Sequence, residues 1–273
     1  MDGKITLYTE QGSLLPCFFH TSLPSTNDEA KRLAREGEGE SFSVAAAEQT
    51  AGRGRMSRTF FSPRCGGLYL SFVCPAGERF ARFGVLAALA VKELLYEYFR
   101  ISVSFKWPND VLAEGKKIAG ILPESIVTAK GDRVVVTGIG VNIFESADDF
   151  GALKDIATSA CLCCKNEEIK REFVQDRQAF LHDAAVRLTE LLARLYRLEQ
   201  EGEDLLPDYK ASLATLGRRV RFRDAEGVTR CGIAADTDAD CALLVDTEEG
   251  RFSVGWGEVT ELLAADADTS CGN

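Results

Sequence analysis

The stretch Phe105-Lys106-Trp107-Pro108-Asn109-Asp110 decides how the middle of this chain folds. The apolar residues Ile101, Val103 and Phe105 alternate before it and predict a strand that ends at Lys106. Proline continues neither a strand ladder nor a helix and holds the residue before it extended, and Asn and Asp favour turns. The stretch therefore predicts a cation, an aromatic ring and two polar side chains fixed at a strand end, where binding loops commonly lie.

Composition limits the classes of protein to which the chain can belong. Its 273 residues, 45% of them hydrophobic, suffice for one large domain with a small appendage. The formal net charge of −10 argues against nucleic acid or an anionic membrane as the main partner. The sequence has no secretion signal and no apolar run of membrane-spanning length, so we expect a cytoplasmic protein.

The nine cysteines raise the alternatives of a zinc site or disulfides. Cys161, Cys163 and Cys164 are close together, but they lack the second pair of ligands that a zinc site requires, and the chain has only two histidines. We therefore expect no metal ligation by the cysteines and predict reduced thiols.

Ser25-Thr26-Asn27 begins a segment in which a structural and a binding explanation coexist. Thr26 and Glu29 have the spacing of a capping box, which predicts a helix that runs to about Arg35. A helix cap alone explains these residues. The free N–H groups of a helix N-terminus also bind ligands, so both explanations stay open.

A basic loop follows a strand predicted for Ser43 to Ala47. It reads Gln49-Thr50-Ala51-Gly52-Arg53-Gly54-Arg55 and continues to Arg58, and it matches neither common glycine-rich nucleotide motif. Arginine forks bind phosphate oxygens in pairs, and glycine lets backbone amides approach them. The loop thus suits a polyphosphate, with a solvated basic loop as the alternative.

Glycines fall within two predicted strands after the central stretch. Gly120 lies in the strand that starts at Lys116, and Gly138 and Gly140 end the strand that starts at Arg133. Glycine inside a strand often marks the close approach of a ligand or of another backbone. These positions predict a groove with bare backbone on its floor.

The remaining pattern predicts an α+β fold. Helical spacing covers residues 79–99, and residues 166–198 form one helix or two consecutive helices, after a loop-like segment at 145–165. Five short strands near the C-terminus predict a small β-barrel. We predict a catalytic domain at 1–213, a barrel at 214–264 and a disordered tail at 265–273.

In order and spacing, five motifs together resemble those of the biotin protein ligases, the biotin–acetyl-CoA-carboxylase ligases. The resemblance covers residues 20–263 and rests on Ser25-Thr26-Asn27, Gln49 to Arg55, Lys106 to Asp110, Lys117 to Leu122, and Gly138 to Asn142. It implies a mixed β-sheet with helices, related to the class II aminoacyl-tRNA synthetases, followed by an SH3-like barrel. Few residues precede Ser25, so the resemblance is to a short form without a DNA-binding domain, and we expect no repressor activity.

The resemblance implies an ATP-dependent reaction in two steps. Biotin and ATP with Mg²⁺ form biotinyl-5'-AMP, and biotin then passes to a lysine of a biotin carboxyl carrier protein or domain. The implied catalytic residues are Lys106, which would bridge the biotin carboxylate and the α-phosphate, and Arg55. The protein is expected to be a monomer or a homodimer.

The resemblance also assigns residues to the two substrates. For biotin they are Ser25, Thr26, Asn27, Gln49, Arg53, Gly54, Arg55, Lys106, Trp107, Gly120, Gly138 and Gly140. For ATP and its phosphates they are Arg53, Arg55, Arg58, Phe60, Asn109, Lys117 and Asn142.

One motif departs from the family pattern. Where the family has Gly-Arg-x-Trp, this chain has Ser57-Arg58-Thr59-Phe60, so a ring that stacks on adenine would offer a smaller face. Two other functions stay open: a lipoate or octanoate ligase of the same fold, and a non-catalytic module that only binds biotin or a partner. The glycine–arginine loop and the central stretch favour biotin, and Lys106, Arg55 and Gln49 together favour catalysis.

Overall fold

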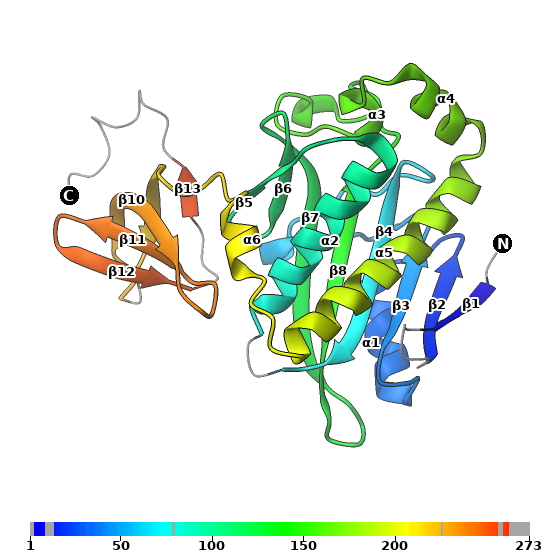
Figure 1. Ribbon diagram of the computed structural model, residues 1–273, viewed down its shortest axis with the longest axis horizontal. Coiled ribbons are helices and arrows are strands. Elements are labelled where there is room, and N and C mark those ends of the chain that lie inside the picture. Colours follow the sequence, from blue (N-terminus) through cyan, green and yellow to red (C-terminus); the bar gives the residue numbers. More distant parts are fainter. Residues whose placement is uncertain (1–2, 9–13, 78–79, 225, 256–258, 262–273) are drawn as a thin grey trace.

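An eight-stranded mixed sheet forms the body of the molecule in the computed structural model, which describes residues 3–8, 14–77, 80–224, 226–255 and 259–261 (Figure 1). Its strands lie in the order β1-β2-β3-β4-β8-β7-β6-β5, and only β2 and β3 pair in parallel among the ladders of this sheet. In chain order the strands are β1 (Gly3–Tyr8), β2 (Leu14–His20), β3 (Phe42–Ala46), β4 (Gly67–Pro75), β5 (Ser104–Lys106), β6 (Asp110–Ala113), β7 (Lys116–Val127) and β8 (Arg133–Asn142).

Helices cover both faces of this sheet. Helices α2 (Arg82–Phe99) and α5 (Arg177–Gln200) lie across one face and bury the main apolar core against the central strands, while α1 (Thr26–Glu36) packs on the other face. The smaller core under α1 is formed by Ala30, Ala34, Phe42, Val44, Val73, Val134 and Val136. With both faces covered, β4 is a nearly continuous run of buried residues. The predicted mixed sheet with helices is confirmed.

Helix α1 begins one residue earlier than a Thr26 cap would allow. Ser25 is the N-cap, and its side chain accepts a hydrogen bond from the Asp28 amide. Glu29 pairs with Arg32 instead of reaching back to the cap. The capping box predicted for Thr26 and Glu29 is therefore wrong, and the Thr26 side chain is available for contacts outside the helix.

The long helical region contains two helices, α4 (Glu167–Gln175) and α5, which are separated at Asp176. Asp176 breaks the helical path and caps α5 by accepting a hydrogen bond from the Ala179 amide at 2.9 Å. The segment 145–165, predicted as loop, contains two short pieces of helix, η2 (Gly151–Leu153) and α3 (Ala160–Cys163).

The central stretch is the tip of the hairpin β5–β6. Lys106 and Asp110 face each other across it, so Asp110 starts a strand that the sequence pattern had assigned to a turn. Outside β5, the connection after helix α6 (Leu206–Lys210) continues the pairing: the Phe105 amide donates to Ser212 O at 2.7 Å, and the Ala214 amide donates to Phe105 O at 2.8 Å. The strand that carries Lys106 is thereby held on both sides.

The C-terminal part forms a five-stranded antiparallel sheet in the order β12-β11-β10-β9-β13, beside β5 and α6 in Figure 1. Its strands are β9 (Arg219–Arg223), β10 (Thr229–Thr237), β11 (Leu243–Thr247), β12 (Gly250–Val254) and β13 (Val259–Glu261). The small β domain predicted from the sequence is confirmed. The tail predicted for 265–273 lies outside the described residues.

Two further findings concern membrane spans and cysteines. In the described part of the chain no helix is long and apolar enough to cross a membrane. Seven described cysteines carry free thiols, whereas Cys231 is disulfide-bonded. The prediction of reduced thiols is wrong for Cys231.

Candidate active site

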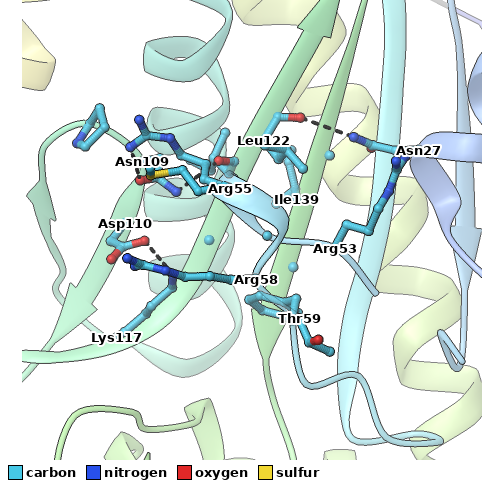
Figure 2. A pocket seen from close by; sticks show the side chains of 18 of the residues that line it. Asn27, Arg53, Arg55, Arg58, Thr59, Asn109, Asp110, Lys117, Leu122 and Ile139 are labelled. Atoms are coloured by element: carbon cyan, nitrogen blue, oxygen red, sulfur yellow. Dashed lines mark hydrogen bonds and ion pairs between the residues drawn. The ribbon is translucent and has the colours of Figure 1, made fainter. Parts of the chain in front are cut away.

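A cavity of about 410 Å³ opens where the N-terminus of α1, the basic loop, the β5–β6 hairpin and the glycine-bearing parts of β7 and β8 converge (Figure 2). Every residue that the sequence assigned to biotin lines it, as do all those assigned to ATP except Asn142. Asn142 is buried instead, and its side-chain amide donates to Thr158 O at 2.9 Å. Residues as far apart in sequence as Ser25 and Val259 thus meet in one place.

The α1 end of the cavity, formed by Ser25, Thr26, Asn27 and Gln49, is a hydrogen-bonded network. Gln49 Oε1 accepts from the Thr26 amide at 2.9 Å and from Thr26 Oγ1 at 3.1 Å. Gln49 Nε2 donates to Ser62 Oγ at 3.1 Å. These bonds fix the orientation of the Gln49 amide before any ligand enters.

Ser71 supports this end from within β4, although nothing in the sequence pattern singled it out. Its hydroxyl lies 2.8 Å from Thr26 Oγ1 and 2.6 Å from Asn27 Oδ1, and it is fully buried. Asn27 Nδ2 donates to Glu124 Oε2 at 2.7 Å and to Leu122 O at 3.3 Å. Burial acts to raise the pKa of Glu124, but hydrogen bonds from Lys31 and Asn27 outweigh it and hold that pKa below its usual value.

The glycines of β7 and β8 do allow close approach, but other side chains of the protein use the space. A Cβ at Gly138 would lie 2.3 Å from Asn27 Oδ1, and one at Gly140 would lie 2.5 Å from a ring carbon of Phe60. At Gly120 the nearest atoms, at 3.2 Å, belong to Lys117 and Phe60. The bare backbone therefore seats Asn27 and Phe60, whose exposed sides become the walls of the cavity.

The cationic end, formed by Arg55, Arg58, Lys106 and Lys117, lies opposite. Lys117 Nζ forms an ion pair with Asp110 Oδ1 at 2.5 Å. Figure 2 shows Arg55, Arg58, Asp110 and Lys117 grouped on one side of the cavity, away from Asn27. Cations that outnumber the carboxylate at this end suit the binding of several anionic oxygens.

Asn109 links the basic loop to the hairpin. Its Oδ1 accepts from Arg55 Nη1 at 3.2 Å, and its Nδ2 donates to Ile121 O at 3.3 Å. The backbone adds a bond from the Ile121 amide to Asn109 O at 2.9 Å. Asn109 thus anchors Arg55 against β7 at the cationic end.

Trp107 borders the cavity but is 3% exposed, and its polar groups are engaged elsewhere. Its amide donates to Thr215 Oγ1 at 3.0 Å, and its indole N–H donates to Cys241 O at 2.8 Å. Trp107 is therefore bonded to the segments that precede β9 and that join β10 to β11, and β13 also contributes Val259 to the cavity wall. No sequence signal pointed to Val259, because a strand with few distinguishing residues carries it.

Arg53 is separated from the other arginines of the loop. Its guanidinium forms an ion pair with Asp28 of α1 and lies 3.9 Å from Glu124, and in Figure 2 it extends toward Asn27.

In the described ranges no group of three or more His, Cys, Asp or Glu could hold a metal ion.

Two family profiles match the chain. That of the Biotin/lipoate A/B protein ligase family matches residues 19–142, and that of the Biotin protein ligase C terminal domain matches residues 215–260. The first contains all of the cavity-lining residues except Val259, which falls in the second.

Proteins of known function are similar over most of the chain. Identity to the Bifunctional ligase/repressor BirA of Bacillus subtilis is 34% over 240 residues, covering 85% of this chain and 70% of that protein. Identity to the Biotin--[acetyl-CoA-carboxylase] ligase of Mycobacterium tuberculosis is 31% over 252 residues, covering 87% and 86%. A biotin protein ligase from Aquifex aeolicus, solved in complex with biotin and ATP, has the same fold, with a TM-score of 0.72, 24% identity, and coverage of 90% of this chain and 99% of that one.

Proposed function

The chain belongs to the biotin protein ligase family, and from this premise we propose that it is a biotin–[acetyl-CoA-carboxylase] ligase that works through biotinyl-5'-AMP. One observation carries the proposal: a single cavity joins a pre-bonded polar end to a cationic end that includes Lys106. The polar end suits the ureido group of biotin, and the cationic end suits the phosphates of ATP. The carboxylate of biotin would meet the α-phosphate between them.

The first step must bring two anionic groups into contact. An oxygen of the biotin carboxylate forms a bond to the α-phosphorus, and the bond from that phosphorus to the bridging oxygen of pyrophosphate breaks. Fixed cations lower the barrier where charge develops on the phosphoryl oxygens. The proposed role of Lys106 is supported by its place at the end of β5, where it lines the cavity together with Arg55 and Arg58 of the loop.

Mg²⁺ fits the donors at the cationic end. The Asp110 carboxylate and the Asn109 amide oxygen both line the cavity there, and Mg²⁺ commonly takes one or two such oxygens while phosphates and water complete its shell. The ion would neutralise phosphate charge. The chain's own contribution is to hold those oxygens on a hairpin that is bonded to β7 and to the loop between β10 and β11.

In the second step, the amine of a carrier lysine attacks the carbonyl carbon of the mixed anhydride. The bond from that carbon to the phosphate oxygen breaks, AMP leaves with the electron pair, and the nitrogen loses a proton. The anhydride must be kept from water until the carrier arrives. The loop with Arg53, Arg55 and Arg58 lies over the cavity and is the part that would shield it.

Repressor activity is not part of this proposal. The Bacillus subtilis relative is named a ligase and a repressor, but the present chain has a net charge of −10, which opposes a DNA-binding surface. The matching family profile also includes lipoate ligases, so the acyl group transferred is the point that an experiment must establish.

One assay tests the proposal against both alternatives. The protein is incubated with labelled biotin, MgATP and a biotin carboxyl carrier domain, and both labelled carrier and pyrophosphate are measured. We expect both to accumulate. A protein that binds biotin but releases no pyrophosphate would be a binding module, and transfer of lipoate or octanoate in place of biotin would identify the related ligase.

A further inference from the structure

The basic loop is a small hairpin of its own, residues 52–60, called here the arginine hairpin. The Phe60 amide donates to Gly52 O at 3.0 Å, the Gly54 amide donates to Arg58 O at 2.7 Å, and Arg53 bridges to Thr59. A side chain at position 52 would place its Cβ 2.6 Å from Phe60 O, so Gly52 permits this close return. The hairpin is therefore bonded within itself, and its outer contacts hold it at the cavity.

Those contacts lie on opposite flanks. On one flank Arg55 donates to Asn109 at the cationic end. On the other flank Arg53 pairs with Asp28, at the start of α1, and approaches Glu124 of β7. Arg55 lies at the end where phosphate oxygens would bind, so it would exchange its bond to Asn109 for a bond to ATP. Arg53 lies at the other end and would keep Asp28 and Glu124 as partners when ATP enters.

The surroundings of Arg53 are balanced in charge. Lys31 lies 2.7 Å from Glu124 and 4.0 Å from Asp28, so two cations and two carboxylates form one cluster. Lys31 and Asn27 both already bind Glu124, whereas Arg53 binds Asp28 most directly. Asp28 does not line the cavity, so its effect on the ligand must act through the hairpin.

We propose that the Asp28–Arg53 ion pair is a latch that holds the arginine hairpin closed and makes Asp28 a positioning residue for retention of the acyl-adenylate. The proposal rests on the proposed function for the nature of the retained ligand. The pair is about half exposed, with side-chain exposures of 54% for Asp28 and 43% for Arg53, so water and salt screen it. Its loss should open the hairpin about two- to fivefold more often, and added salt should have the same effect on the intact pair.

The test compares Asp28→Asn with two matched variants. Asp28→Asn removes the charge while the backbone amide that caps α1 stays in place. Glu36→Gln is the control, because Glu36 is on the same helix, is 58% exposed and pairs with an arginine, Arg32, outside the cavity. Asp28→Glu keeps the charge and should restore the behaviour of the natural protein.

The first measurement needs no ligand and does not depend on ligase activity. Trypsin cleaves after arginine, so mass spectrometry follows the rate of cutting at residues 53, 55 and 58. We expect Asp28→Asn to be cut two- to fivefold faster at low salt, with Glu36→Gln and Asp28→Glu cut at the natural rate. At high salt the natural protein should approach Asp28→Asn. Equal rates in all four proteins at low salt would overturn the latch.

The second measurement concerns the adenylate. With biotin and MgATP but no carrier, the first-turnover burst of pyrophosphate reports formation, and labelling of bystander lysines reports escape. Asp28→Asn should leave the burst unchanged and raise escape two- to fivefold. An unchanged escape rate with faster tryptic cutting would show that the latch does not retain ligand and would overturn its positioning role. If the natural protein gives no burst, the proposed function fails while the cleavage result still stands.

Discussion

At the α1 end of the cavity, Ser25, Thr26 and Asn27 are 3–4% exposed and hydrogen-bonded within the protein, whereas at the cationic end Lys117 and Asp110 keep 34% and 26% of their side-chain surface. The first end is completed by folding, since Thr26, Asn27, Gln49, Ser71 and Glu124 already satisfy one another. The second end holds cations that outnumber its carboxylate and has a surplus of positive charge that a phosphate would neutralise.

The difference separates recognition from catalysis. A pre-bonded polar site rejects ligands that cannot replace its hydrogen bonds, because each buried group left without a partner costs about 1–3 kcal/mol. A cluster of partly exposed cations discriminates less but lowers the energy of a transition state that carries negative charge. Changes at the cationic end should therefore act on rate, and changes at the α1 end should act on biotin affinity.

The largest effect is expected from Lys106→Ala. Loss of the cation that we propose to contact the developing charge should slow adenylate formation by at least about 10²–10³-fold, with little change in the melting temperature. Pyrophosphate release in a single turnover measures this. Lys116→Ala is the control, because Lys116 starts β7 and bonds Lys154 O outside the cavity. An active Lys106→Ala protein would show that Lys106 is not the catalytic residue.

Arg55→Gly should have the next largest effect, on retention of the adenylate rather than on its formation. A charge-assisted hydrogen bond contributes about 1.5–3 kcal/mol, so its loss should speed escape by about 10–100-fold. Biotinylation of bystander lysines in the absence of carrier measures escape. If the adenylate escapes at the natural rate, Arg55 does not hold the phosphate, and only Arg58, Lys106 and Lys117 remain as phosphate-binding candidates at the cationic end.

Ser71→Ala tests the α1 end. It removes the group that bonds both Thr26 and Asn27, so the KM for biotin should rise about tenfold while the rate at saturating biotin stays close to natural. Ser43→Ala is a matched control, because Ser43 is equally buried but bonds Thr189 of α5 on the opposite face. Both variants should lose stability, and only Ser71→Ala should weaken biotin binding. Equal KM values for the two would mean that the network serves folding alone.

Sequence patterns predicted this site unevenly, and the reason is the range of the interactions. The family resemblance is confirmed, and the strand-end position of Lys106 followed from a local pattern that ends at a proline. Arg53 and Arg55 look equivalent in sequence, yet they lie on opposite flanks. Arg53 is in the paired arm of the hairpin opposite Thr59, whereas Arg55 begins the short 3₁₀ turn η1 (Arg55–Ser57) at its tip. Ser71, Asp28 and Val259 become visible only once distant strands and helices meet.

The role of Trp107 shows the same limit. The resemblance assigned Trp107 to biotin, and Trp107 does line the cavity, but the sequence did not show that its indole N–H donates to Cys241 O, more than 130 residues later in the chain. Only the tertiary structure reveals a contact of that sequence separation. The glycines of β7 and β8 were predicted only in part. Their small size correctly indicated a close approach to the backbone, but the groups that approach are the side chains of Asn27 and Phe60, and not a ligand or another backbone.

The smallest expected effect contrasts two carboxylates through the pH dependence of stability. Glu124, at the α1 end, is held below its usual pKa by Lys31 and Asn27, so it contributes stability above its unfolded pKa that is lost as the pH falls through the folded value. Glu145, just after β8, is 2% exposed, and burial raises its pKa to about 7. Its contribution is present below its unfolded pKa of 4.5 and is lost as the pH rises toward 7.

The two glutamine variants should therefore change stability in opposite directions. Glu145→Gln removes a charge that the core must bury at high pH, so its melting temperature relative to the natural protein should rise by roughly 2–4 °C between pH 5 and pH 8. Glu124→Gln should lower the melting temperature at pH 8 and have less effect at pH 4, where the paired carboxylate is closer to protonation. Thermal unfolding of the three proteins across this range measures both. If Glu124→Gln were as stable as the natural protein at pH 8, the paired charges would not support the α1 end, and its rigidity would rest on Ser71 and Gln49 alone.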